Sequence, residues 1–388
     1  MDKRLVWGLM LLLSACLPEP TTPAPSSTTV LPPTETPSPT PTVTLTPGLT
    51  ITGQGRLIYL LGSKVYGGGF SGDNAGEIAA LGEGQIDSPR LRGNRMAYLL
   101  GRELRLLDLR EGSATTLFTL PEGAILDTFD LCWSIGGEAI AYTVAYEDPE
   151  ALTFGRAVEV GVIDLPMGER RLVTTLKDRF LATLLGYDDA SGELFLIPRG
   201  GDPSFEEIVV YDGWRRDRVI KSIPLQGDAM PDQSVLSPDL SRLALASFDS
   251  EAGTGQILVY DLTVAQPVAQ PLELPPGTHA RCFIWSTHGQ RLAYLLHSGV
   301  AYGDEVTEAR GLWAWDLSDE AIKVAEEDSP FSGPVAWSLE GEAILAFYYE
   351  EGDGYYYLAS RDGSGVMRLD IDPEARALGW APEVSEGG

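Results

Sequence analysis

The 388-residue chain is acidic and rich in turn-forming residues, with 44% hydrophobic residues for a sizeable core and 43 glycines with 27 prolines that disfavour long helices. Its formal net charge of −28 argues against a nucleic-acid partner and against direct docking on anionic lipid headgroups. Three cysteines and three histidines provide neither a disulfide framework nor a zinc site of the CxxC type.

Residues 1–16 have the pattern of an export signal. Lys3 and Arg4 precede an apolar run, residues 5–13, that is too short to span a bilayer. The sequence LSAC at residues 13–16 resembles the bacterial lipobox, in which the cysteine is acylated and becomes the new N-terminus. The resemblance implies lipidation of Cys16 and a location on the outer, extracytoplasmic face of the cell envelope. An ordinary secretory signal with an incidental cysteine is the alternative.

Residues 17–50 are dominated by proline and threonine. Such a segment cannot bury a core and favours extended polyproline II, which gives a reach on the order of 100 Å at about 3.1 Å per residue. We therefore expect three parts: a lipoprotein signal peptide over 1–16, a disordered tether over 17–50 and a folded domain over 51–388.

The folded part repeats. Four segments share a large apolar residue, a serine, a short turn and an alternating apolar strand: CWSIGGEAIAYTV (132–144), VLSPDLSRLALAS (235–247), FIWSTHGQRLAYLL (283–296) and VAWSLEGEAILAFY (335–348). Further strands, one before these segments and four between them, end in an aspartate that occupies one repeat position: Asp108, Asp164, Asp212, Asp261 and Asp316. A recurrence near 40–50 residues, with only strand patterns in between, predicts four-stranded propeller blades.

Ser286 and His288 invite comparison with a nucleophile and its base. The repeat argues otherwise, because serine recurs at this position in four blades and only one of them has a histidine nearby. We interpret the serine as the first residue of a β-turn, whose last residue is a glycine with positive φ. The recurring aspartates are likewise interpreted as turn residues.

These units resemble the TolB-type, WD40-like propeller family, whose repeat runs W-S-P-D-G followed by an apolar strand. LSPDLSRLALA (236–246) is a close match, with Leu240 where the family has glycine. The resemblance spans residues 55–382 and implies an all-β propeller. Four tryptophans lie at the A-strand position, where we expect them to pack between blades: Trp133, Trp285, Trp337 and Trp380.

The two ends of the repeat region complete one another. Residues 56–81 read as three strands that lack a preceding A strand, and residues 376–383 read as an A strand with nothing after it. We predict seven blades, with six or eight as alternatives, and a ring closed by pairing this C-terminal strand with the N-terminal blade.

The remaining thiols and imidazoles have unremarkable expected roles. Cys132 and Cys282 fall in blades on opposite sides of the ring, too far apart for a disulfide. We expect His279 in a loop between blades, His288 in a turn and His297 at a strand end. Pointing to different ends of one blade, they would not form a three-histidine metal site.

Loop lengths differ between the two faces of the predicted ring. The turns joining first to second and third to fourth strands are tight, and we name their side the tight-turn face. The other side, the long-loop face, has acidic connections that are longer than a hairpin needs. Five aromatic residues of these loops form the candidate binding face, although solvated acidic loops are an equal alternative: Phe154, Phe205, Tyr302, Tyr349 and Tyr355.

We therefore expect a surface-anchored, monomeric, non-enzymatic propeller that acts as a binding or interaction scaffold for a protein, peptide or glycan. It would need no cofactor, bind no nucleic acid and contact the membrane through its lipid anchor only. The alternative is a lactonase- or glycosidase-like propeller enzyme with a site at the channel mouth. A Ca²⁺-dependent module is a weaker third reading, because no D-x-[DN]-x-[DN]-G loop is present.

Overall fold

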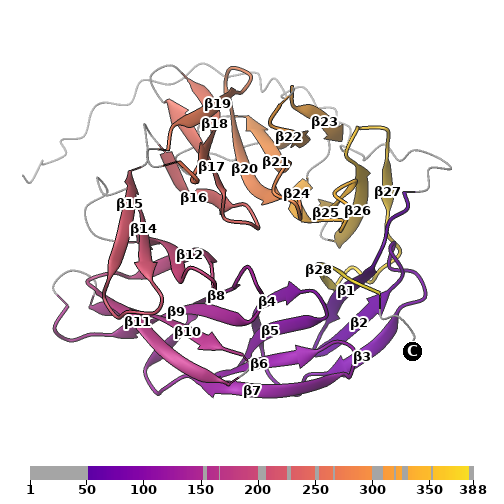
Figure 1. The fold of residues 1–388 in the computed structure, drawn as a ribbon. Helices are drawn as coiled ribbons and strands as arrows, with labels where there is room; N and C mark the ends of the chain where they lie inside the picture. The colour runs from indigo at the N-terminus through magenta and orange to yellow at the C-terminus, as the bar shows by residue number, and fades with distance from the viewer. Residues whose placement is uncertain are drawn as a thin grey trace, which may run out of the picture. The chain divides into compact units, whose positions relative to one another are not determined.

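The computed structural model describes residues 51–151, 155–165, 167–199, 207–224, 229–249, 253–264, 267–298, 309–318, 320–325, 331–350 and 353–383. Cys16 and the expected tether lie outside them. The described chain forms 28 strands in seven four-stranded antiparallel sheets, arranged around a centre as a seven-bladed β-propeller (Figure 1). These residues include no helix long and apolar enough to cross a membrane.

The first four blades use the following strands. Blade 1 comprises β28 (Arg376–Ala381), β1 (Arg56–Leu61), β2 (Lys64–Gly68) and β3 (Gly76–Ala80). Blade 2 comprises β4 (Ile86–Arg92), β5 (Arg95–Leu100), β6 (Glu103–Asp108) and β7 (Ser113–Thr119). Blade 3 comprises β8 (Ala124–Trp133), β9 (Ala139–Glu147), β10 (Arg156–Asp164) and β11 (Glu169–Lys177). Blade 4 comprises β12 (Leu181–Tyr187), β13 (Glu193–Arg199), β14 (Glu207–Asp212) and β15 (Val219–Pro224).

The last three blades follow the same order from the centre outward. Blade 5 comprises β16 (Ala229–Leu236), β17 (Arg242–Asp249), β18 (Thr254–Asp261) and β19 (Ala269–Glu273). Blade 6 comprises β20 (Thr278–Trp285), β21 (Leu292–Ser298), β22 (Ala309–Trp315) and β23 (Ile322–Ala325). Blade 7 comprises β24 (Phe331–Trp337), β25 (Ala343–Glu350), β26 (Asp353–Ser360) and β27 (Val366–Arg368).

The ring closes as the sequence predicted. Strand β28 pairs antiparallel with β1, so that Trp380 lies opposite Leu57. The Trp380 ring stacks on Phe70, with centroids 5.3 Å apart, and its Nε1 donates to the Phe70 carbonyl at 3.0 Å. Blade 1 is therefore built from both ends of the folded region, and no innermost strand is left without a partner.

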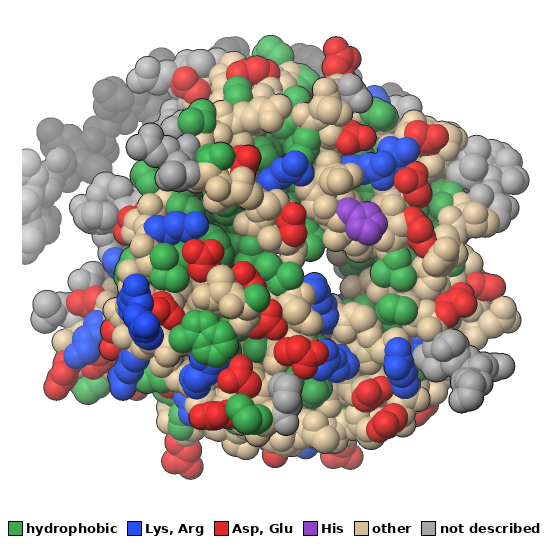
Figure 2. Space-filling view, in the orientation of Figure 1, with side chains coloured by type: hydrophobic (Ala, Val, Ile, Leu, Met, Phe, Trp, Pro, Cys, Tyr) green, Lys and Arg blue, Asp and Glu red, His purple; other side chains and the backbone are tan. Residues whose placement is uncertain are grey.

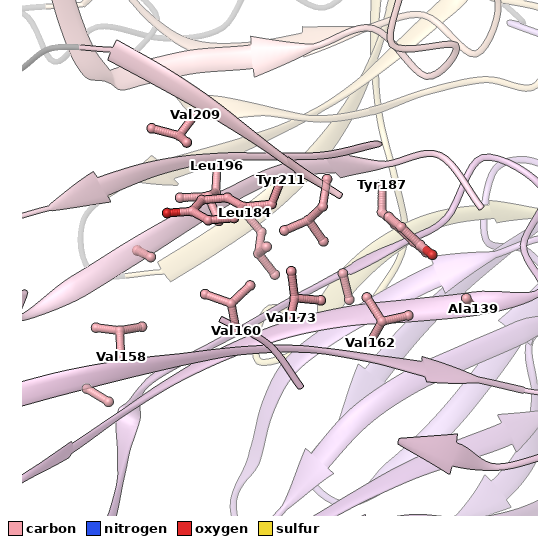
Figure 3. Close-up of a cluster of buried hydrophobic side chains, with 14 residues drawn as sticks. Ala139, Val158, Val160, Val162, Val173, Leu184, Tyr187, Leu196, Val209 and Tyr211 are labelled. Atoms are coloured by element: carbon pink, nitrogen blue, oxygen red, sulfur yellow. The ribbon is translucent and has the colours of Figure 1, made fainter. Parts of the chain in front are cut away.

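Apolar side chains from neighbouring sheets form the core. Between blades 3 and 4, valines of β10 face apolar side chains of the blade 4 sheet, among them Leu184 and Leu196 (Figure 3). These side chains come from strands buried on both faces, which explains why the second and third strands are nearly continuous apolar runs. Each pair of neighbouring blades repeats this sheet-on-sheet packing.

The serine turns have the predicted geometry. In blade 6 the buried Ser286 hydroxyl accepts a hydrogen bond from the Arg291 backbone N–H at 3.1 Å, and the Gly289 N–H donates to the Ser286 carbonyl at 2.9 Å. Gly289 has φ 65°, a conformation that favours glycine. In blade 5 Leu240 takes the corresponding position with φ 54°, and its side chain packs against blade 4 where Gly186 leaves room.

Tryptophans and arginines join consecutive blades. The indole N–H of three A-strand tryptophans donates to a carbonyl of the preceding innermost strand, as Trp285 does to Val235 at 3.1 Å. Arginines at the second strand reach the other way: Arg291 Nη1 donates to the carbonyl of Gly341, the turn glycine of the next blade, at 2.7 Å. Arg95 of blade 2 and Arg242 of blade 5 make the same contact with the turn glycine of the blade that follows.

Candidate functional site

Three of the recurring aspartates, Asp108, Asp212 and Asp261, accept backbone N–H groups of the turns that follow their strands. Asp108 Oδ1 accepts the Arg110 backbone N–H at 2.7 Å, and Asp261 Oδ1 accepts that of Thr263 at 2.9 Å. Hydrogen bonds from the Thr263 hydroxyl and backbone hold the pKa of Asp261 below its ordinary value. The repeated serines and four of the five repeated aspartates are thus engaged in structural hydrogen bonds, which directs attention to features that only one or two blades have.

One such feature is a cleft of about 480 Å³ between blades 5 and 6. It opens on the tight-turn face, because its walls come from the turns and strand ends of that side. Carboxylates, amides and an arginine meet there with an apolar wall, and the lining residues are Arg242, Val259, Asp261, Val268, Gln270, Gln290, Asp316, Leu317 and Ser318.

The cleft is held by contacts between its own walls. Gln270 Nε2 of blade 5 donates to the Leu317 carbonyl of blade 6 at 3.4 Å. Leu317 has φ 57°, an unusual conformation for a leucine, within the turn that follows Asp316. Arg291 Nε lies 3.7 Å from Asp316 Oδ2, so this carboxylate already has a cationic neighbour. The lining itself holds one arginine against two aspartates.

The central channel is a second feature, and its wall is irregular. The register shifts in the pairing of all seven innermost strands with their neighbours. Such bulges leave backbone groups unpaired and re-aim side chains. Ser88 and Cys282, both with positive φ, lie at two of these shifts. Figure 2 shows an opening at the centre of the ring, with Lys and Arg side chains on its rim.

Charged side chains of the innermost strands meet near blades 1 to 3. Arg90 Nη2 of β4 lies 3.2 Å from Asp130 Oδ1 of β8. Burial raises the pKa of Asp130, although the Arg90 charge acts in the opposite direction. Burial and repulsion from Arg90 lower the pKa of Arg376 in β28. A carboxyl group whose pKa is raised by burial, although a guanidinium group lies beside it, is a candidate for proton transfer.

The predicted binding face lies largely outside the described residues. This holds for Phe154, Phe205 and Tyr302, and for the side chain of Tyr349, whose backbone belongs to β25. Tyr355 is described: it is half-buried, packs against the core between blades 6 and 7, and has the Arg368 guanidinium 3.7 Å from its ring centroid. Its ring therefore has a packing role, and its removal would also affect stability.

One expectation about the histidines is wrong. His279 and His297 lie opposite one another on β20 and β21, with ring centroids 5.7 Å apart, instead of pointing to different ends of the blade. The reason is that β20 begins at Thr278, earlier than the sequence suggested. Among the described residues no group of three His, Cys, Asp or Glu side chains converges in a way that could hold a metal ion.

The two described cysteines lie in the expected blades, and no disulfide joins them. Cys132 is partly buried in blade 3, whereas Cys282 in blade 6 is exposed and not buried as expected. Burial raises the pKa of Cys132 to about 12, which leaves its thiol protonated at neutral pH.

Fold and turn chemistry together define the chain as a seven-bladed β-propeller of the kind built from degenerate four-stranded repeats. No family model and no curated protein matches the sequence. Among solved structures, it is similar to oligogalacturonate lyase in complex with manganese (TM-score 0.58, 13% identity, covering 76% of this chain and 82% of that one). Oligogalacturonate lyase from Vibrio parahaemolyticus matches with TM-score 0.58 and 11% identity over 76% and 83%.

TolB from Acinetobacter baumannii also matches, with TM-score 0.46 and 14% identity over 84% of this chain and 67% of that one. At these identities the likenesses to the lyase structures show the fold alone. The propeller is a scaffold that hosts unrelated functions, so the function has to be argued from the residues of this chain.

Sequence reasoning did not find the cleft. Its members are ordinary turn and edge-strand residues, and Gln270 and Gln290 belong to no motif. Leu317 gave no signal either. A leucine directly after the recurring aspartate is shared with blades 2, 3 and 5, and the left-handed conformation of Leu317 is not visible in the sequence.

Proposed function

We propose that this protein is a non-enzymatic, lipid-anchored propeller that binds a partner at the outer face of the cell envelope. The LSAC sequence ending at Cys16 and the Pro/Thr-rich residues 17–50 support the anchor and the tether. The cleft between blades 5 and 6 is the observation that supports binding, because it offers hydrogen-bonding groups of both kinds beside an apolar wall. Its partner is a protein, a peptide or a glycan.

Site-specific photo-cross-linking on intact cells tests this function. A cross-linking residue at Gln290 probes the cleft, and one at Tyr302 probes the long-loop face. Glu138, an exposed residue at the turn position of blade 3 that corresponds to Gln290, is the matched control. Capture of one partner from position 290 or 302, with none from 138, is expected. Equal yields from all three positions would contradict a defined binding site.

A propeller enzyme with its site in the channel is the second candidate, favoured by the raised pKa of Asp130 beside Arg90. The fold likeness makes oligogalacturonate a reasonable first substrate to assay. Turnover that is lost in Asp130→Asn while the melting temperature is kept would establish the enzyme and displace the first proposal. Absence of turnover with this and related acidic oligosaccharides is the result that the binding function predicts.

A further inference from the structure

The surface of blades 3 and 4 differs from the rest of this acidic protein. Among the described residues, eight large hydrophobic side chains are exposed, and four of them gather here with arginines. We call this set the blade 3–4 corner: Met167, Trp214, Arg215, Arg216, Arg218, Val219 and Ile220. Met167 is 74% exposed and Trp214 is 53% exposed. Figure 2 shows Lys and Arg side chains gathered around exposed apolar groups at the lower left of the view.

The Trp214 side chain is fixed in its exposed position. A Cβ atom on Gly192 would lie 2.1 Å from the indole, so the ring fits closely over this turn only because residue 192 is glycine. The Arg171 guanidinium carbon lies 4.4 Å from the ring centroid. Arg171 itself is held by Asp164 at 3.0 Å and donates to the Gly213 carbonyl at 2.9 Å. An aromatic ring ordered before binding loses little entropy when it binds.

The turns of the two blades form one unit. The Asp217 backbone N–H of blade 4 donates to the Val173 carbonyl of blade 3 at 2.8 Å. The Thr174 hydroxyl donates to Asp217 Oδ1 at 2.8 Å. Met167 precedes the same strand, β11, so the exposed groups of both blades are presented on a shared, rigid support.

The exposed charge of the corner is opposite in sign to that of the whole chain. The side chains of Arg215 and Arg216 are 70% and 63% exposed. Their neighbour Asp212 is only 12% exposed, because it accepts the Trp214 backbone N–H and pairs with Arg218. Asp217, 61% exposed, is the carboxylate left at the tip. Within residues 212–220, three guanidinium groups therefore face solvent against one exposed carboxylate.

This combination selects a particular kind of surface. Tryptophan prefers the headgroup level of a bilayer, and arginine can reach phosphates while its aliphatic stem contacts apolar groups. A purely polar polyanion would pair with the arginines but would leave Met167, Val219 and Ile220 in water. A phospholipid surface uses both. The 34 residues from 17 to 50 are long enough to let any side of the ring reach the membrane.

We propose that the blade 3–4 corner docks the propeller on anionic phospholipid headgroups, with Trp214 and its aliphatic neighbours in the interface and Arg215, Arg216 and Arg218 on the phosphates. Docking would fix the orientation of the ring on its tether. It adds a second membrane contact to the proposed lipid anchor, on which it depends for a high local concentration.

Vesicle experiments with the full-length protein test the docking. Vesicles of phosphatidylcholine, with or without phosphatidylglycerol, carry a nitroxide-labelled lipid that quenches tryptophan fluorescence at the membrane. The quenching of Trp214 is the difference between wild type and Trp214→Phe. We expect it only with phosphatidylglycerol, and we expect it to fall as salt is raised. Equal quenching in both kinds of vesicle, or none, would overturn the proposal.

Variants separate the parts of the corner. Arg215→Gln and Arg216→Gln should each weaken the phosphatidylglycerol-dependent quenching about fivefold. Arg110→Gln is the matched control, an exposed arginine after the recurring aspartate of blade 2, and should change nothing. Val219→Ser should weaken docking on vesicles and leave binding to soluble heparin unchanged. Heparin binding as strong as vesicle binding, with no quenching, would identify a polyanion site and refute membrane docking.

A Cys16→Ser variant distinguishes docking from anchoring. Co-sedimentation with phosphatidylcholine vesicles reports the anchor, whereas phosphatidylglycerol-dependent quenching reports the corner. Docking predicts that the quenching persists in Cys16→Ser at sufficient vesicle concentration, even where co-sedimentation is lost. Quenching that disappears in Cys16→Ser at every vesicle concentration would show that the corner has no membrane affinity of its own.

Discussion

Blades 6 and 4 have the same four strands but use their turns differently. In blade 6 the first turn starts at the buried Ser286, and Arg291 joins the blade to its neighbour. In blade 4 Asp188 takes the place of the serine. The next residue, Asp189, contacts the turn of blade 3 and accepts hydrogen bonds from the Ser134 hydroxyl at 2.9 Å and the Gly136 N–H at 3.0 Å. Both arrangements join the blade to a neighbour, so the ring accommodates different turn residues as long as a contact between blades is kept.

Loss of ring closure should have the largest effect of any change considered for this comparison. A chain ending at Ala375 lacks β28 and leaves its buried partners in blades 1 and 7 exposed, including those of Trp380. Removal of a buried tryptophan alone costs about 3–5 kcal/mol, so we expect a loss above about 5 kcal/mol in urea unfolding followed by circular dichroism. A chain ending at Glu383 keeps β28 and is the control. Equal melting of the two chains would contradict closure by β28.

The serine position comes next. Ser286→Ala leaves the Arg291 N–H without its acceptor in a buried turn, so we expect a loss of about 1–3 kcal/mol in the free energy of unfolding. His288→Ala, in the same turn, should change it by less than about 0.5 kcal/mol. Denaturant midpoints measure both. If the two substitutions had equal effects, Ser286 would not have the structural role that the repeat assigns to it.

The two kinds of blade-to-blade contact can then be compared directly. Asp189→Ala removes hydrogen bonds to a carboxylate from both Ser134 and Gly136, and should cost about 2 kcal/mol. Arg291→Ala removes one bond to the Gly341 carbonyl and partly exposed ion pairs, and should cost about 1 kcal/mol. The order of the two values, taken from urea unfolding, is the prediction. The reverse order would mean that the regular blades are joined more strongly than blade 4.

The smallest effect concerns acid stability in blade 7. Hydrogen bonds from Ser360 and Ser364 lower the pKa of Asp362 to about 2. Because the folded-state pKa lies below the ordinary value of 3.8, the contribution is complete above about pH 4 and disappears as the pH falls toward 2. Solvent screening keeps it below about 1 kcal/mol. Asp362→Asn should flatten the stability of the protein between these pH values; an unchanged slope would contradict this assignment.

The fold was predictable from the sequence because the ring repeats one unit. Alternating apolar strands, a serine and a glycine at fixed spacing, and aspartates at one repeat position indicate the blades independently of one another. The missing strand of blade 1 and the extra strand at residues 376–381 then fix the closure. Each of these signals lies within a short stretch of sequence and can therefore be recognised without knowing which segments meet in the fold.

The cleft and the blade 3–4 corner were not predictable in the same way. Both depend on which turns of neighbouring blades meet, as Gln270 and Leu317 do, and on which carboxylates are buried. The net charge of −28 is a sum over the whole chain and does not show where arginines gather on the surface. It also counts the largely buried Asp212 equally with exposed carboxylates. The histidine pair was missed because a shift of a few residues in where β20 begins decides which side chains face each other.

The shared construction of blade 1 has a consequence for when the protein can fold. Trp380 contacts Phe70 across 310 positions of the chain, so the first blade stays incomplete until the last strand has been synthesised. Contacts this distant in sequence form slowly. This delay would suit the export proposed above, because the N-terminal strands of a chain that crosses a membrane in extended form could not complete the ring before the C-terminal residues had followed them across.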